Sequence, residues 1–403
     1  MKRVWNREAA ATWSRELLLL AAAIFVLRFG EGLVGGARAN FFVDTLSLDG
    51  GQVLWLEGVR EVPGLLLMVI AAFLTQVPLA RRGGLAVALM GIGFITHALV
   101  QSYSALLVVS VVASLGNHIW MPISPALGLS LATKETSGRV LGNLGSVGAL
   151  ASIVGMGALA LISRFATGFP LRIYFVVGGV LMLAAAGVIL LLPASVGATE
   201  RKQPRMLLKG RYWLFYVLTL FDGARKQVLY SFGTLVLVQY FGYEVWQISL
   251  ILLASAAVNL VFSPALGAAV DRYGERATLS LSYVGIALCC AAFAVLRNPL
   301  LLAVLVVLIK LLQVLGMGLN TYVNRMAPDE ELTPTLTAGI SINHVSSVVA
   351  PLVAGAVMPI IGYQGVFLAT AVLIALSVPF AAALRVEPLP APAVELRPSA
   401  AAD

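Results

Sequence analysis

Long apolar stretches recur along this chain and are separated by short loops. A helix of roughly twenty apolar residues spans the hydrocarbon core of a bilayer. Because the stretches are apolar throughout rather than alternating with a period of two, they indicate helices and not barrel strands. The sequence therefore predicts an all-α polytopic membrane protein. Twelve helices are expected, at residues 16–43, 53–76, 84–102, 104–130, 139–162, 172–193, 212–241, 246–269, 277–296, 299–324, 335–361 and 364–384.

Basic residues mark one side of the predicted bundle. Eighteen of the 27 Lys and Arg residues fall at the termini or in loops after even-numbered predicted helices, whereas only Arg164, Arg172 and Arg297 fall in the opposite loops. Short loops rich in Lys and Arg are typically cytoplasmic. We therefore expect both termini on the cytoplasmic side of a cell inner membrane. The net charge of +8 then reflects membrane topology, and we expect no nucleic-acid partner.

The composition agrees with a membrane environment, and a basic linker indicates two halves. Of 403 residues, 60% are hydrophobic and 11% are charged, too few polar groups to cover a water-soluble globule. A basic linker at 194–211 separates an N-terminal six-helix bundle at 1–193 from a C-terminal one at 212–385, and 386–403 is expected to be a disordered cytoplasmic tail. The two predicted halves also share a register of identical residues. A shift of 200 residues superposes Leu115 on Leu315, Gly116 on Gly316, Thr133 on Thr333, Asn143 on Asn343, Ser146 on Ser346 and Gly155 on Gly355. Parallel repeats with a site at their interface are typical of transporters.

The loop between the eighth and ninth predicted helices carries a G-x-x-x-D-R-x-G-x-R pattern. It runs from Gly267 through Asp271, Arg272 and Gly274 to Arg276. By this motif and the two sets of six helices, the chain resembles the major facilitator superfamily over nearly its whole length. The resemblance implies 12 transmembrane helices in two pseudo-symmetric six-helix bundles that alternate between two open states.

The motif residues are candidates for gating. Asp271 at a helix end can accept hydrogen bonds from a neighbouring helix, while Arg272 and Arg276 can pair with acids or lipid phosphates. The resemblance implies a charge latch in this loop, and a simple topogenic loop is the alternative. The equivalent first-half loop at 77–84 has no acidic residue, which puts a latch there in doubt.

Charged residues inside the first predicted helix indicate function, because ionisable groups at membrane depth are costly. Arg28, Glu31 and Arg38 lie on one helical stripe. Gly32 and Gly36 form a G-x-x-x-G pair on a neighbouring face, suited to close helix contact. The sequence thus predicts one polar face and one tightly packed face.

The seventh predicted helix is more densely charged, with Asp222, Arg225, Lys226 and Tyr230 near its middle. Asp222 can reach Arg225 or Lys226, so an intrahelical ion pair is one interpretation. However, two cations against one carboxylate leave a positive surplus that is costly in lipid. This surplus favours a water-filled cavity that holds an anion.

Further polar residues lie near the middle of other helices. Lys310 and Gln313 lie on the tenth, and Asn343 with His344 on the eleventh. The resemblance implies that helices one, four, seven and ten line a central cavity. His118 lies near the middle of the fourth predicted helix, and for it and His344 a packing role is as open an interpretation as ligand or proton binding. The substrate-binding candidates are Arg28, His118, Arg225, Lys226, Tyr230, Lys310 and Gln313, and the proton-coupling candidates are Glu31 and Asp222.

Glu57, Arg60 and Glu61 are placed at the outer end of the second predicted helix. They could form an outer gate. An interfacial ion-pair cluster, of the kind found where helices emerge into water, is the simpler hypothesis.

Absent motifs narrow the function. The chain has no Walker loop, no Cys/His metal spacing and no H-E-x-x-H sequence, so we expect no enzyme activity, no cofactor and no metal. In drug/proton antiporters of the family an Arg usually lies four residues before a Gly on the fourth helix. Here Val112 takes that position before Gly116, which counts against a drug/proton antiporter.

The leading hypothesis is a monomeric secondary transporter in contact with membrane lipid. It would move a small organic solute, anionic or zwitterionic, by alternating access and proton-coupled efflux. A drug/proton antiporter for lipophilic compounds and a non-transporting membrane receptor are the alternatives.

Overall fold

The computed structural model describes residues 13–67, 74, 76–133, 136–166, 168–197 and 207–385, and all regular elements in these segments are helices. The predicted tail and residues 198–206 of the predicted linker lie outside the described residues. The N-terminal half comprises α1 (Arg15–Asn40), η2 (Phe41–Thr45), α2 (Gly50–Val59), α3 (Val62–Leu65), α5 (Leu79–His97), α6 (Tyr103–Ser130), α7 (Ser137–Phe165) and α8 (Arg172–Leu190). The C-terminal half comprises η3 (Gly210–Tyr212), α9 (Trp213–Gln227), η4 (Val228–Phe232), α10 (Gly233–Phe241), α11 (Val245–Val295), α12 (Pro299–Gln313), η5 (Val314–Met317), α13 (Gly318–Met326) and α14 (Asp329–Ala382).

Two of these helices each contain two membrane spans. α11 turns back at Gly274 (φ 79°) and α14 at Gly362 (φ 65°), and positive φ values of this kind favour glycine. The seventh span is α9, η4 and α10 in succession, and the tenth is α12, η5 and α13. With these assignments the described residues are consistent with twelve spans near the predicted positions. Eight helical segments are long and apolar enough to cross a membrane by length and composition alone.

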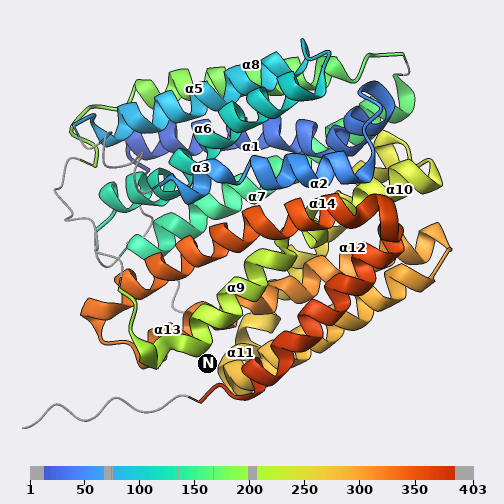
Figure 1. Ribbon diagram of the computed structural model, residues 1–403. Helices are drawn as coiled ribbons and strands as arrows, with labels where there is room; N and C mark the ends of the chain where they lie inside the picture. Colours follow the sequence, from blue (N-terminus) through green and yellow to red (C-terminus); the bar gives the residue numbers. More distant parts are fainter. Residues whose placement is uncertain are drawn as a thin grey trace, which may run out of the picture.

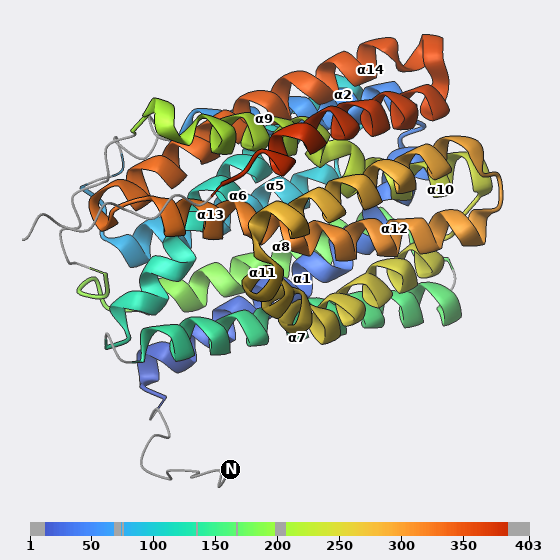
Figure 2. The same ribbon diagram turned by 90° about the horizontal axis from the view of Figure 1, so that it is seen from below.

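The spans run side by side along one common direction (Figures 1 and 2). We call the end where α1, α7 and η3 begin the basic end, because the basic loops lie there. The other end, where α2, α11 and α12 begin, is the opposite end. In Figure 1 the basic end lies to the left.

The second span differs from its prediction. A continuous helix was expected at 53–76, but α2 ends at Val59 and α3 begins at Val62. Pro63 has no backbone N–H to donate to the preceding turn, so a continuous helix would lose a hydrogen bond there. The break places Arg60 and Glu61 between two helical segments in the middle of the bundle.

Close helix contact at the predicted glycine face is confirmed. A Cβ atom added to Gly32 would lie 2.7 Å from the backbone oxygen of Ser152 on α7. One added to Gly36 would overlap the side chain of Leu159, also on α7. Small residues thus let the first and fifth spans approach closely.

The two halves meet chiefly through two pairs of helices, with further contacts between α1 and α11 and between α3 and α14. α2 packs against the first span of α14, and α7 packs against α11. Contacts of the second span with α14 run from Gly51 on α2 beside Gly355 at the opposite end to Gly64 on α3 beside His344 at mid-depth. The halves are therefore joined from the opposite end to the middle of the bundle.

Candidate functional site

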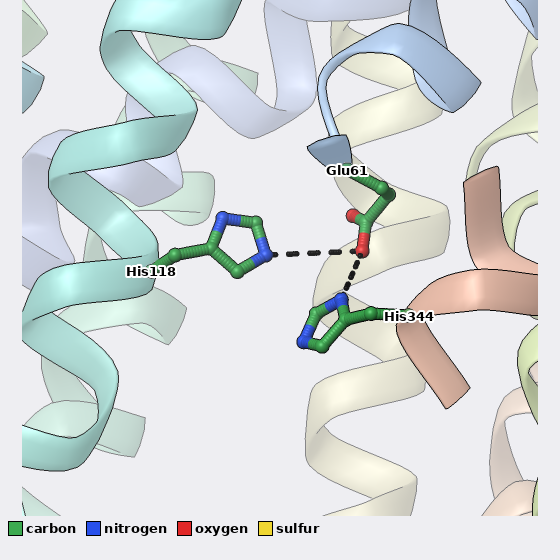
Figure 3. A group of neighbouring side chains, drawn as sticks. All are labelled: Glu61, His118 and His344. Carbon is green, nitrogen blue, oxygen red and sulfur yellow. Dashed lines mark ion pairs between the residues drawn. The ribbon is translucent and has the colours of Figure 1, made fainter. Parts of the chain in front are cut away.

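Glu61 lies at the break in the second span and is only 2% exposed. Its Oε2 atom is approached by Lys226 Nζ at 3.1 Å, His344 Nδ1 at 3.3 Å and His118 Nε2 at 3.8 Å. Figure 3 shows the two imidazole rings reaching this oxygen from separate helices. One buried carboxylate thus collects basic groups from α6, α9 and α14.

These partners belong to different halves of the molecule. His118 on α6 comes from the N-terminal half, whereas Lys226 on α9 and His344 on α14 come from the C-terminal half. A buried charge left without a partner is strongly destabilising. The Glu61 contacts therefore fasten the halves together at mid-depth.

The His118 ring is fixed by its own helix. Its Nδ1 lies 2.8 Å from the backbone oxygen of Ser114 and 3.1 Å from the Ser114 hydroxyl oxygen. The Ser114 hydroxyl also donates to the backbone oxygen of Arg60, at the break in the second span. This arrangement directs Nε2 of His118 toward Glu61.

Glu57 extends the network toward the first helix. Its carboxylate is fully buried and accepts hydrogen bonds from Arg38 on α1 and from Arg60. Arg60 Nη2 also lies 3.7 Å from Glu61 Oε1. The hypothesis of an interfacial cluster in water is therefore wrong, because α1, α6 and α14 cover these residues inside the bundle.

Arg28, the first residue of the polar stripe on α1, faces a cavity. Arg28 Nη1 donates to Glu31 at 2.7 Å, and the arginine side chain is half exposed. It lines a cavity of about 440 Å³ together with Trp120, Ser124 and Ser152. This cavity lies on the basic-end side of mid-depth, between α1, α6 and α7.

The two cations of the seventh span take different directions. Arg225 Nη2 bonds Asp222 at 2.9 Å, which is the intrahelical pair that was one interpretation of the sequence. Arg225 is 3% exposed and lies over the Tyr283 ring, 4.2 Å from its centroid. Asn343 Nδ2 contacts the other Asp222 oxygen at 3.3 Å. Arg225 thus packs within the C-terminal half, whereas Lys226 pairs with Glu61 of the N-terminal half.

Lys310 on α12 and Tyr230 on η4 lie together in the C-terminal half. Lys310 Nζ is 4.6 Å from the Tyr230 ring centroid, and Tyr230 is 59% exposed on the π-helical turn η4. Gln313, one turn beyond Lys310, is partly buried at the end of α12.

The predicted latch motif forms the turn inside α11, at the basic end. Arg325 on α13 contacts Asp271 at 3.3 Å and the buried Glu275 at 2.9 Å. Arg272 lies over the Tyr273 ring, and Arg276 is exposed. Sequence reasoning missed Arg325 and Glu275, although Glu275 stands inside the motif and Arg325 lies at the basic end of the tenth span.

Comparison with known proteins agrees with this architecture. The sequence matches the Major Facilitator Superfamily in two overlapping segments, residues 20–320 and 214–401. No curated protein matches it in sequence. The structure resembles a mutant of the nucleoside transporter NupG, with a TM-score of 0.77 and 16% identity over 92% of this chain and 99% of the other. It also resembles a bacterial homologue of the human lysosomal transporter Spinster in an inward-facing and occupied conformation, with a TM-score of 0.72 and 15% identity over 92% and 97% of the two chains.

At these identities the solved structures establish the fold, and the family match establishes descent. The predicted resemblance and the predicted fold of two six-helix bundles are both confirmed. The chain belongs to the Major Facilitator Superfamily.

Proposed function

We propose that this transporter moves a small organic anion or zwitterion by alternating access between its halves. The observation that carries the proposal is a surplus of positive charge inside the bundle. The inner parts of the described spans hold six basic side chains and four carboxylates. The basic residues are Arg28, Arg38, Arg60, Arg225, Lys226 and Lys310, and the acids are Glu31, Glu57, Glu61 and Asp222.

Lys310 is the centre of this surplus. Among the described residues its charge contacts the ring of Tyr230 rather than a carboxylate. A cation over an aromatic face gains only about 0.5–2 kcal/mol, less than burial of a charge costs. An anionic group of the solute would compensate this charge, with Tyr230 and Gln313 as hydrogen-bonding neighbours.

The direction of transport and its coupling belong to the same proposal. We place the basic end in the cytoplasm, following the distribution of Lys and Arg. The halves are joined at the opposite end and the Arg28 cavity lies on the basic-end side, which supports access from the cytoplasm in this state. Proton-coupled efflux would then use Glu31 or Asp222, the carboxylates beside Arg28 and Arg225.

The test begins with solute classes. Thermal unfolding of the purified protein is followed with organic anions, amino acid zwitterions, neutral nucleosides and lipophilic cations, because a ligand that binds only the folded form raises its stability. Nucleosides are included because NupG is a nucleoside transporter. We expect anions or zwitterions to raise the unfolding temperature and to show counterflow in proteoliposomes.

The variant Lys310→Gln should abolish this shift, whereas Lys310→Arg should retain part of it. Lys209→Gln is the matched control, because Lys209 is an exposed lysine paired with Glu331 outside the cavity. Stabilisation by lipophilic cations alone would contradict the proposal and favour a drug/proton antiporter.

A further inference from the structure

Three possible metal ligands converge at the boundary between the halves. The donor atoms of Glu61, His118 and His344 all lie within 4.8 Å of one another, and the three side chains are buried. They come from three helical segments that are far apart in sequence, so a linear motif does not reveal them (Figure 3). We propose that this cluster binds a divalent transition-metal ion such as Zn²⁺, which ties the N-terminal half to the C-terminal half.

The two imidazole rings present suitable nitrogens. Nδ1 of His118 faces the Ser114 carbonyl oxygen, so a neutral ring carries its proton there and directs the lone pair of Nε2 into the cluster. A carbonyl partner of this kind commonly orients metal-binding histidines. Nδ1 of His344 is buried and lies 3.3 Å from Glu61 Oε2, but among the described residues it makes no hydrogen bond of regular geometry. Coordination would satisfy this atom, which is otherwise costly to bury.

Gly64 leaves room for an ion between the rings. A Cβ atom at this position would lie 2.6 Å from both His118 Nε2 and His344 Nδ1. Any larger residue would therefore fill the space that the ion needs. Since Zn–N bonds are about 2.0–2.1 Å long, binding requires shifts on the order of 1 Å in the rings and the carboxylate.

Lys226 is the competitor for this position. Its ammonium bonds the same Oε2 atom of Glu61 at 3.1 Å, but its side chain is 38% exposed. The cluster is therefore accessible from the side on which Lys226 lies, and an entering ion can displace the ammonium toward solvent. Arg60 stays beside the other carboxylate oxygen.

The donor set selects the class of metal. Two imidazole nitrogens, one carboxylate oxygen and a water molecule suit Zn²⁺, Co²⁺ or Ni²⁺ in four-coordinate geometry. Mg²⁺ and Ca²⁺ prefer oxygen ligands and serve as control ions. The bound ion holds His344 against the N-terminal half, so it stabilises the state in which the halves are closed at this depth.

Metal binding is measured on the full chain, purified and treated with chelator, in a background where Cys289 and Cys290 are replaced by Ala. We expect one Zn²⁺ per chain by calorimetry, an absorption spectrum typical of tetrahedral Co²⁺, and no heat from Mg²⁺. His118→Gln and His344→Gln should each weaken Zn²⁺ binding by at least about tenfold. The remaining histidine, His97, bonds Gly93 and Ser110 away from the cluster, so His97→Gln is the matched control.

Lys226→Met should have the opposite effect on Zn²⁺ binding from the two histidine variants. Removal of the competing ammonium should lower the Zn²⁺ dissociation constant, a gain that a misfolded variant cannot produce. Stoichiometric binding that survives both histidine substitutions, or no binding above the Mg²⁺ control, would overturn the proposal.

Inhibition of transport by Zn²⁺ rests on the proposed function, whereas binding does not. A metal-binding protein without measurable transport would reject the proposed function and leave this inference standing. If the site is saturated with Zn²⁺ and the transport rate does not fall, the claim that the ion stabilises the closed state is wrong.

Discussion

Lys226 Nζ lies 3.1 Å from Glu61 Oε2, and this bond joins the seventh span to the break in the second span across the boundary between the halves. Glu61 is almost fully buried in this arrangement. Any movement that separates the halves here removes Lys226 and His344 from the carboxylate together. The charge on Glu61 therefore stabilises the state closed at the opposite end.

Removing that charge should favour the open state. We expect Glu61→Gln to increase the population open at the opposite end by about tenfold or more, since loss of one partner of a buried pair costs roughly 3–5 kcal/mol and 1.4 kcal/mol is a factor of ten. Spin labels at Gln101 and Leu300, exposed residues at this end in different halves, measure the distance distribution. The labelled background lacks Cys289 and Cys290.

Glu57→Gln is the matched control for this experiment. Glu57 is equally buried, but its partners Arg38 and Arg60 both belong to the N-terminal half. This variant should lower the unfolding temperature without changing the distance distribution. An equal change in both variants would show that general loosening, not the contact between halves, is being measured.

The turn inside α11 leads to a second prediction. Arg325 pairs with the exposed Asp271 and with the buried Glu275. Exposed pairs contribute about 0–1 kcal/mol, whereas an unpaired buried acid costs several times more. We therefore expect Arg325→Gln to lower the unfolding temperature clearly and Asp271→Asn to lower it little.

The same pair of variants also tests the latch. If the turn controls gating, distance labels across the basic end should report altered populations in Asp271→Asn. The unmodified protein, labelled at the same positions, is the reference. Identical distance distributions in the unmodified protein, Asp271→Asn and Arg325→Gln would show that the loop does not control gating. It would then be a topogenic signal that packs on α13.

Much of the fold could be predicted because it depends on local pattern. The length of each apolar stretch sets a span, and the spacing of Gly32 and Gly36 correctly indicated close packing. The break in the second span was missed, although Pro63 was the signal for it. An apolar run alone does not show whether its hydrogen bonds continue through a proline.

The Glu61 cluster could not be predicted, because it depends on how spans from both halves rotate against one another. His118 and His344 were identified as candidates, but neither spacing nor composition reveals that both face one carboxylate. Lys226 was read with its helical neighbour Asp222, whereas its partner lies 165 residues away in sequence. Pairing across a helix interface requires the tertiary structure.

Helix packing is tested at Gly155 on α7. A Cβ atom there would overlap the backbone oxygen of Phe29 on α1, which cannot rotate away as a side chain could. Gly155→Ala should therefore destabilise the protein by about 1–3 kcal/mol, the usual cost of overpacking. Gly157→Ala, on the same helix with nothing within 4 Å of the added Cβ, should leave the thermal unfolding midpoint unchanged. Equal midpoints for both variants would contradict the close approach of the two spans.

Coupling of transport to protons is tested at Glu31. Its carboxylate is held by Arg28 at 2.7 Å, and Arg28 lines the cavity on the basic-end side. An anionic solute that binds Arg28 competes for the same guanidinium, so Glu31 loses its partner and can accept a proton in its place. Solute and proton would then occupy neighbouring groups, and the movement of one depends on the other.

We expect Glu31→Gln to abolish pH-driven accumulation of solute in proteoliposomes while retaining solute exchange at equal pH, because Gln keeps a hydrogen bond to Arg28 but cannot change charge. The parallel variant Asp222→Asn removes the carboxylate paired with Arg225, which lies inside the C-terminal half rather than on this cavity. If Glu31→Gln still accumulates solute under a proton gradient and Asp222→Asn does not, the coupling carboxylate belongs to the seventh span, and the Arg28–Glu31 pair only shapes the cavity.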